Sequence, residues 1–167
     1  MVINANRGMY IEQLVERTID FYNCKNICHI EKRHIPLKII KKINETTAVA
    51  KILTKSFVDY FGTINGKYVE FECKQTVNEY FDLNLIKSHQ WEYLNTIGNY
   101  QNSLSFIIIC FEKIDSIILI DTKTLKECHK QNKNKKIPYN LLIKYGIKLE
   151  IIYPGIIDIH NGVSILK

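Results

Sequence analysis

The chain has 167 residues, of which 46% are hydrophobic and 24% are charged, which is ordinary for a globular protein and enough for a single domain over residues 1–167 but not for two. It contains no apolar run long enough to cross a membrane, and its start, MVINANRG, lacks the basic and apolar parts of a signal peptide, so we expect a cytoplasmic protein without membrane contact. The net charge of +6 favours nucleic acid as a partner, although the lysine-rich composition of an AT-rich genome gives the same charge without a binding role.

Hydrophobic periodicity and turn residues predict a mixed α/β fold. Apolar side chains recur at helical spacing from Ile11 to Tyr22, whereas later apolar runs are short and rich in β-branched residues, as in strands. In chain order we predict a helix at residues 7–23, strands at 27–31, 37–43, 46–53, 56–60 and 67–74, a helix at 88–97, strands at 104–111 and 117–120, a short helix from 122, a basic loop at 130–136, a helix at 138–146 and a strand at 147–153. Ser88 suits the N-cap of its helix, and Pro138 suits a first helical turn.

The two arms at residues 37–43 and 46–53 flank Asn44-Glu45, which we interpret as a turn. Lysines are frequent along both arms, and few residues there are suited to burial on two faces. The arms therefore form either a ribbon that projects from the body or an ordinary edge hairpin solvated by lysine.

The most informative stretch is a second hairpin around Asn65-Gly66. An Asn-Gly pair between two β-like runs is a strong hairpin signal, because both turn positions need a positive φ. If Asn65 and Gly66 are the two central residues, Ile64 pairs with Lys67. The same register places Asp59 directly opposite Glu72 on one face, with Cβ atoms roughly 5 Å apart.

Alternation along residues 67–74 predicts which side chains share that face. One face carries Tyr68, Glu70, Glu72 and Lys74, and the core face carries Val69, Phe71 and Cys73. Two facing carboxylates repel each other, and a divalent cation such as Mg²⁺ would offset that repulsion. Lys74 points into the same space, where it can hold an attacking water or stabilise negative charge on a phosphate. The alternative is an exposed acidic face that Lys74 neutralises as a surface ion pair.

An Asp, a hairpin and then Glu-x-Lys resembles the PD-(D/E)xK nuclease superfamily. More closely, the chain resembles the RecU-type Holliday junction resolvases of low-GC Gram-positive bacteria and mollicutes. The supporting segments occur in the family order and cover most of the chain: residues 5–12, 32–36, 59–60, 66–74 and 89–90.

This resemblance implies a restriction-endonuclease-like α/β fold, with a mixed β-sheet flanked by helices and a projecting β-ribbon stalk at residues 36–55. It implies a homodimeric endonuclease that uses one or two Mg²⁺ ions, or Mn²⁺, and nicks four-way DNA junctions symmetrically in recombination and repair. It also implies a nucleoid-associated location and a recombinase or branch-migration helicase as further partners. Carried over by position, the catalytic residues are Asp59, Glu72 and Lys74, and the metal site is Asp59, Glu72 and Gln90, with Glu12 and Glu70 as further candidate ligands. We also expect DNA-binding residues in the basic side chains of the ribbon and near it, namely Arg7, Arg33, Lys38, Lys41, Lys42 and Lys51.

The chain departs from the family pattern in its stalk, which has no arginine where relatives usually carry one. Glu70 stands where aspartate is usual, Val58 where threonine is usual and Cys73 where alanine is common. The Asp, Glu and Lys of the motif are intact, which favours an enzyme. Two alternatives stay open: a less selective nuclease that resembles restriction endonucleases, and a non-catalytic junction-binding or recombinase-modulating protein.

Three weaker candidates have alternatives of their own. Glu12 lies at the edge of the apolar stripe of its helix, where it faces either the sheet or solvent. Gln90 follows Ser88 closely, so it either approaches the metal or bonds the helix cap. Cys24, Cys28 and His29 have no fourth ligand at useful spacing, which disfavours zinc, and five cysteines without framework spacing fit a reducing compartment.

Overall fold

A computed structural model describes residues 9–53 and 57–166 of the chain. Its centre is a six-stranded sheet with the order β1-β4-β5-β7-β8-β10, in which β5 and β7 are parallel and the other pairs are antiparallel. The elements in chain order are α1 (Met9–Cys24), β1 (Cys28–Lys32), β2 (Leu37–Lys42), β3 (Ala48–Ile52), β4 (Tyr60–Ile64), β5 (Lys67–Thr76), β6 (Tyr80–Asp82), η2 (Leu83–Leu85), α2 (Ser88–Ile97), β7 (Ser103–Phe111), η3 (Glu112–Ile114), β8 (Ser116–Asp121), α3 (Thr122–Asn132), β9 (Lys136–Pro138), α4 (Tyr139–Tyr145), β10 (Ile147–Leu149), β11 (Ile151–Ile152), β12 (Ile156–Ile157) and α5 (Ile159–Ile165).

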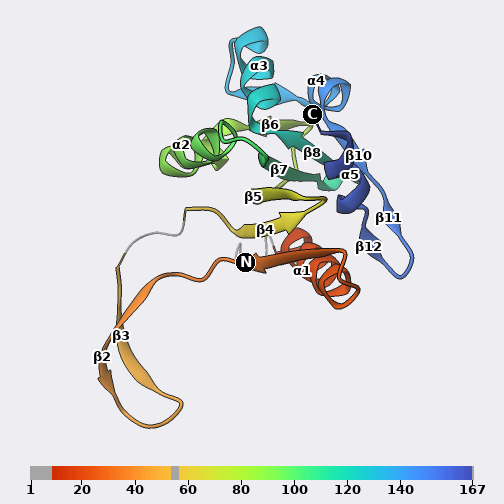
Figure 1. The fold of residues 1–167 in the computed structure, drawn as a ribbon. Helices are drawn as coiled ribbons and strands as arrows, with labels where there is room; N and C mark the ends of the chain where they lie inside the picture. Colours follow the sequence, from red (N-terminus) through yellow and green to blue (C-terminus); the bar gives the residue numbers. More distant parts are fainter. Residues whose placement is uncertain (1–8, 54–56, 167) are drawn as a thin grey trace.

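Helices cover both faces of this sheet (Figure 1). One core lies between the sheet and α1 and α5, and the second lies between the sheet and α2, α3 and α4. Strand β7 serves both cores, because Phe106 and Ile108 face the first while Ile107 and Ile109 face the second. A strand covered on both faces is continuously apolar, which explains its unbroken hydrophobic run. The predicted mixed α/β sheet flanked by helices is confirmed.

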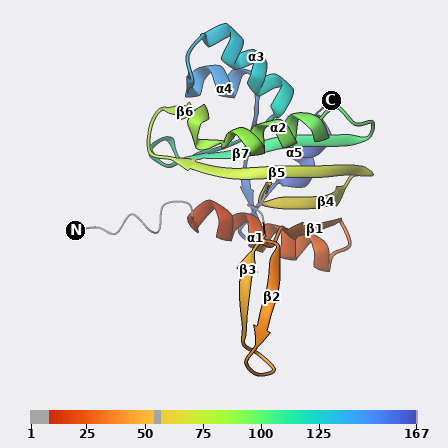
Figure 2. The same cartoon turned by 90° about the vertical axis from the view of Figure 1, so that its left-hand side faces the viewer.

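Strands β2 and β3 form a ribbon that projects from the body (Figure 2). They pair with each other and with no strand of the central sheet, and all their residues are exposed. A turn forms at the predicted place, where the Asn44 side chain accepts hydrogen bonds from the backbone N–H groups of Thr46 at 3.0 Å and Thr47 at 2.8 Å. It is longer than predicted, because β2 ends at Lys42 and β3 begins only at Ala48. Of the two interpretations, the projecting ribbon is therefore correct and the edge hairpin is wrong.

Several predicted boundaries need correction. The strand predicted at residues 56–60 begins only at Tyr60, and Phe57 and Asp59 lie in bends, where Phe57 stacks on Tyr93 of α2 and the Asp59 side chain accepts a hydrogen bond from the backbone of Cys73 in β5. The strand predicted at 147–153 is divided between β10 and β11, which belong to different sheets. The predicted basic loop at 130–136 is shorter, since α3 continues to Asn132.

Several short elements were not predicted, namely β6, η2, η3, β9, β12 and α5. Strand β6 pairs with β9 in a small separate sheet, and α5 follows β12 near the end of the chain. Elements of three residues, or with few apolar positions, carry too weak a periodic signal to be recognised. No helix in the described part of the chain is long and apolar enough to cross a membrane.

Candidate active site

The β4–β5 hairpin has the predicted turn and register. Asn65 and Gly66 have φ values of 53° and 73°, the left-handed conformations that a two-residue hairpin turn of this kind requires. Ile64 pairs with Lys67, and the ladder continues in the same register to Tyr60, which pairs with Phe71. Asp59 is the next residue beyond the ladder, so it lies at the end of β4 beside the middle of β5.

Asp59 is held beside Glu72 through the backbone of β5. Its Oδ2 accepts a hydrogen bond from the backbone N–H of Cys73 at 3.3 Å, and its own carbonyl accepts one from the N–H of Arg33 at 2.7 Å. The face assignment on β5 is confirmed, because Phe71 and Cys73 belong to the core under α1 while Glu72 is directed toward α2.

Glu72 is a carboxylate almost fully withdrawn from solvent, with 1% exposure. Its Oε1 accepts hydrogen bonds from Gln90 Nε2 at 2.8 Å and from Lys74 Nζ. Its Oε2 is buried and has no hydrogen-bond partner among the described residues. Burial raises the pKa of the Glu72 carboxyl to about 7; the ammonium of Lys74 opposes this shift, and the charge of Asp59 adds to it.

Gln90 bonds the helix cap, which is one of the two roles left open from the sequence, and it also contacts Glu72. Its Oε1 accepts a hydrogen bond from the backbone N–H of Lys87 at 3.1 Å, which closes the first turn of α2. Its Nε2 is thereby directed at Glu72. The cap residue of α2 is Lys87 and not Ser88, so the predicted cap is wrong by one residue. Gln90 thus fixes the start of α2 against the carboxylate.

Glu70, two residues before Glu72 on the same face, is also 1% exposed but is fully engaged. Its Oε2 pairs with Arg33 Nη2 at 2.8 Å, and its Oε1 accepts hydrogen bonds from the hydroxyls of Tyr68 at 2.5 Å and Tyr93 at 2.6 Å. Desolvation, followed by the bond to Glu70, raises the pKa of Tyr68 to about 12 and also raises that of Tyr93. Both Glu70 oxygens are therefore occupied by protein donors.

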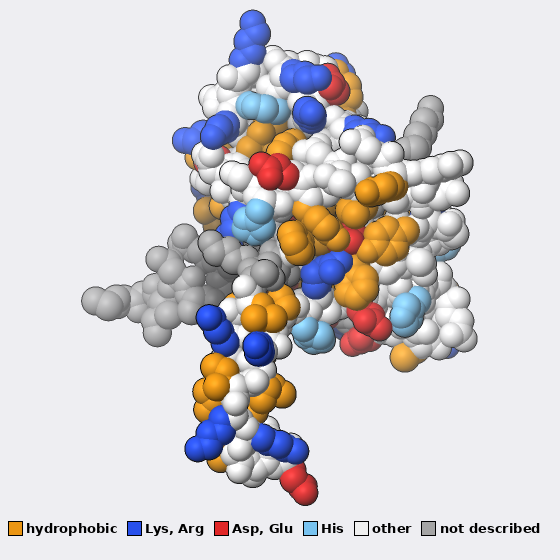
Figure 3. All heavy atoms as spheres, turned by 60° about the vertical axis from the view of Figure 1, so that its left-hand side comes forward, with side chains coloured by type: hydrophobic (Ala, Val, Ile, Leu, Met, Phe, Trp, Pro, Cys, Tyr) orange, Lys and Arg blue, Asp and Glu red, His pale blue; other side chains and the backbone are white. Residues whose placement is uncertain are grey.

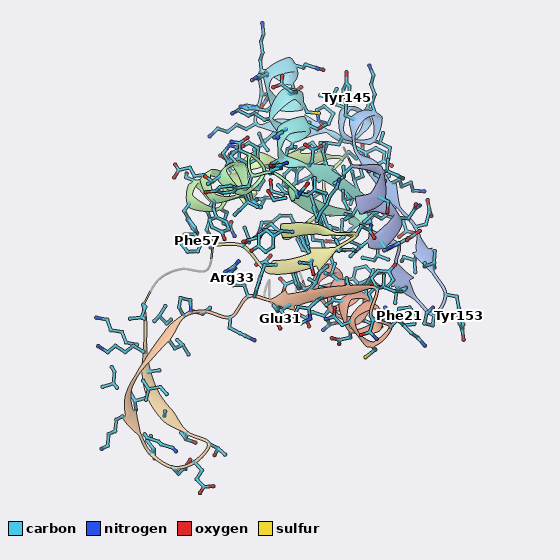
Figure 4. All side chains as sticks on the ribbon, viewed as in Figure 1. Phe21, Glu31, Arg33, Phe57, Tyr145 and Tyr153 are labelled. Carbon is cyan, nitrogen blue, oxygen red and sulfur yellow. The ribbon has the colours of Figure 1, made fainter. Side chains whose placement is uncertain are left out.

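These contacts fasten the base of the ribbon to α2. Arg33 begins the segment that leads into β2, and its guanidinium lies 4.4 Å from the ring centroid of Phe61 and 5.8 Å from that of Tyr93. Phe57, on the returning segment, stacks on Tyr93 with ring centroids 4.7 Å apart. Figure 4 shows Arg33 and Phe57 at the side of the body from which the ribbon leaves. Tyr93 was missed from the sequence, although its spacing of three residues from Gln90 puts both on one face of α2.

The other predicted site residues lie outside this constellation. Glu12, in the first turn of α1, pairs with Lys32 Nζ at 3.1 Å, and its side chain is 41% exposed. Arg7 lies outside the described residues. The ribbon lysines are exposed, and they are Lys38, Lys41, Lys42 and Lys51. In the described residues no group of three or more His, Cys, Asp or Glu side chains is arranged to hold a metal ion; the candidate acidic pair is Asp59 with Glu72.

A family profile described as "Recombination protein U", RecU, matches residues 6–165. The chain belongs to the RecU family. A RecU relative from Ureaplasma parvum serovar 3, named Holliday junction resolvase RecU, is 35% identical over 98% of this chain and 95% of its own length. A RecU of the same name from Mycoplasmopsis pulmonis is 34% identical over 94% of this chain and 93% of its own length.

Among solved structures, the Holliday junction resolvase Hjc of Archaeoglobus fulgidus is similar with a TM-score of 0.48 and 13% identity, over 82% of this chain and 94% of Hjc. RecU membership rests on the family profile and the sequence relatives. It confirms the resemblance inferred from the motif residues, which lie at the β4–β5 hairpin, the start of α2 and the base of the ribbon.

Proposed function

We propose that this chain is a Holliday junction resolvase, an endonuclease that nicks four-way DNA junctions symmetrically during recombination and repair. The observation that carries the proposal is the buried Glu72 carboxylate, with Lys74 and Gln90 on one oxygen, Asp59 beside it and no partner for the other oxygen. The RecU relatives named as Holliday junction resolvases support it.

The residues present fit a divalent metal ion. A buried carboxylate oxygen without a partner is costly, and a second acidic side chain nearby adds to that cost. Carboxylate oxygens are the ligands that Mg²⁺ prefers, together with water and phosphate. We propose that Asp59 and Glu72 hold one or two Mg²⁺ ions, with Mn²⁺ as a substitute and Gln90 beside the site. When bound, the ion supplies charge stabilisation at the phosphate and lowers the pKa of a bound water.

The protein side chains have distinct roles in this proposal. Lys74 places a positive charge beside Glu72, where it can orient the attacking water or stabilise charge that develops on the phosphate. Gln90 fixes the orientation of Glu72 through its bond to Oε1. We assign Glu70 to anchoring Arg33, because its oxygens already accept three hydrogen bonds from protein donors. Glu12 stays a candidate for an outer ligand.

The ribbon and the symmetry of the substrate complete the proposal. We treat residues 1–167 as one nuclease domain whose stalk, residues 36–55, enters the junction crossover, with its exposed lysines and with Arg7 and Arg33 near the backbone. A homodimer would present two sites related by a twofold axis, which matches the near-symmetry of a four-way junction. A nucleoid-associated location and a recombinase or branch-migration helicase as partner belong to the same proposal.

The test is a nicking assay on a four-way junction and on a duplex of the same sequence, with Mg²⁺ or with EDTA. We expect paired nicks on the junction that require Mg²⁺ and disappear in Glu72→Gln, while junction binding persists in that variant. Junction binding without nicking by the unaltered protein would show instead a non-catalytic junction-binding protein. Equal cutting of junction and duplex would show an unselective nuclease.

A further inference from the structure

The positive charge of the chain is concentrated in a second segment besides the ribbon. Residues 121–136 contain six lysines and only two acidic residues, in a chain whose total net charge is +6. All six lysines are exposed, and we call them together the α3 basic surface: Lys123, Lys126, Lys130, Lys133, Lys135 and Lys136. None of the exposed large hydrophobic side chains lies in this segment.

The needs of the helix itself do not explain these lysines. Leu125 and Cys128 bury the inner face of α3, while Lys123, Lys126 and Lys130 recur on the outer face at spacings of three and four. A cation in the last turn favours a helix, but Lys123 stands in the first turn, where its charge opposes the helix dipole. Within residues 121–136 the one ion pair is Lys130 with Glu127, at 2.6 Å. Crowded like charges cost free energy unless a polyanion binds them.

A groove connects this surface to the helix that carries Gln90. It has a volume of about 360 Å³, and its lining includes Ser88, Trp91 and the acidic Glu92 of α2 together with His129 and Lys135. Gln90 lies between Ser88 and Trp91 in the chain and donates to Glu72. In Figure 3, Lys and Arg side chains gather at the top of the face, over α3, and again on the ribbon at the bottom.

We propose that the α3 basic surface binds the phosphate backbone of a duplex arm of the junction. The contacted phosphates lie farther along that arm than the phosphates at the active site. The inference rests on the proposed function and extends its substrate contacts to a region the motif residues do not touch. From Lys123 to Lys130 the helix rises about 10 Å, a length over which duplex DNA presents about six phosphates. The absence of exposed large apolar side chains in residues 121–136 fits a polyanion better than a membrane or an apolar protein partner.

The experiment compares two double variants that remove the same charge from different places. The test variant is Lys126→Gln with Lys130→Gln, and the control is Lys25→Gln with Lys148→Gln. Each pair loses one lysine that is bound to a glutamate, since Lys130 pairs with Glu127 and Lys148 with Glu150. Each also loses one exposed lysine that has no ion pair in the described part of the chain.

Binding to a four-way junction is measured in EDTA over a range of salt concentrations, so that no cleavage intervenes. We expect the slope of log K against log salt to fall in magnitude by about 2 in the test variant and to stay unchanged in the control. Equal slopes in all three proteins, or equal losses in both variants, would overturn the proposal. If the test variant does not fold, Lys123→Gln with Lys133→Gln replaces it. Because this readout needs no cutting, a failed nicking assay and a failed slope test remain distinguishable.

Discussion

Replacing Glu72 by glutamine distinguishes a metal site from a surface ion pair with Lys74. Without metal, the variant should be more stable than the unaltered protein if Glu72 is a buried metal ligand, and less stable if Glu72 serves only as the partner of Lys74. Glutamine keeps the shape of the side chain and the acceptor for Gln90, but it has no charge to desolvate. The folded protein raises the pKa of Glu72 from 4.5 to about 7, which corresponds to about 3 kcal/mol. As pH rises, Glu72 ionises at a lower pH in the unfolded chain than in the folded protein. Its contribution to the free energy of unfolding is therefore lost as pH rises from 4.5 through about 7, and it stays lost at pH 8.

In EDTA at pH 8, Glu72→Gln should therefore recover part of that cost. The pKa of about 7 already includes the opposing charge of Lys74, so the gain can reach about 3 kcal/mol, or about 9 °C in melting temperature for a chain of this size. The gain should shrink strongly at pH 5, where Glu72 is mostly protonated in the folded protein. Added Mg²⁺ should stabilise the unaltered protein at pH 8 and leave the variant unchanged.

The measurement is thermal unfolding of both proteins at pH 5 and pH 8, with EDTA and with Mg²⁺. The exposed Glu79 offers a matched control, because Glu79→Gln should change neither the melting temperature nor the response to Mg²⁺. A Glu72→Gln protein that is less stable in EDTA at pH 8, or that Mg²⁺ stabilises as much as the original, would refute the reasoning.

Three further outcomes are expected. Lys74→Gln should lower the rate of junction nicking by about 10²–10³ with binding retained, whereas Lys67→Gln on the same strand should not; a rate loss of equal size in both would contradict the role given to Lys74. Arg33→Gln should lower the free energy of unfolding, measured with urea, by about 3–5 kcal/mol, because it leaves Glu70 buried without its cation. Tyr93→Phe should lower it by only about 1–2 kcal/mol. The reverse ranking would count against the anchoring role. Replacing residues 37–52 with a short Gly-Ser linker should leave the melting temperature within about 2 °C, since every residue of both strands is exposed and none packs in the core. The same change should abolish the preference for junction over duplex in a cleavage assay.

The sequence alone determined the chemistry-bearing hairpin, for a local reason. Asn65-Gly66 permits essentially one tight turn, and a two-residue turn sets the register of everything that follows. Alternation then separated Glu72 and Lys74 from the core side chains of the same strand. For the hairpin of β2 and β3 the sequence left a projecting ribbon and an edge hairpin open, and the structure decided between them, because these two strands pair only with each other.

Only the tertiary structure decided how those side chains are engaged. Glu70 and Glu72 have the same residue type, the same strand face and the same burial, yet one is saturated by Arg33 and two tyrosines while the other keeps a bare oxygen. The difference arises because α2 and the base of the ribbon approach β5 from distant parts of the chain. Local spacing carries no record of such approaches, so the anchor at Tyr93 and the double role of Gln90 emerged only when the helix was packed on the sheet.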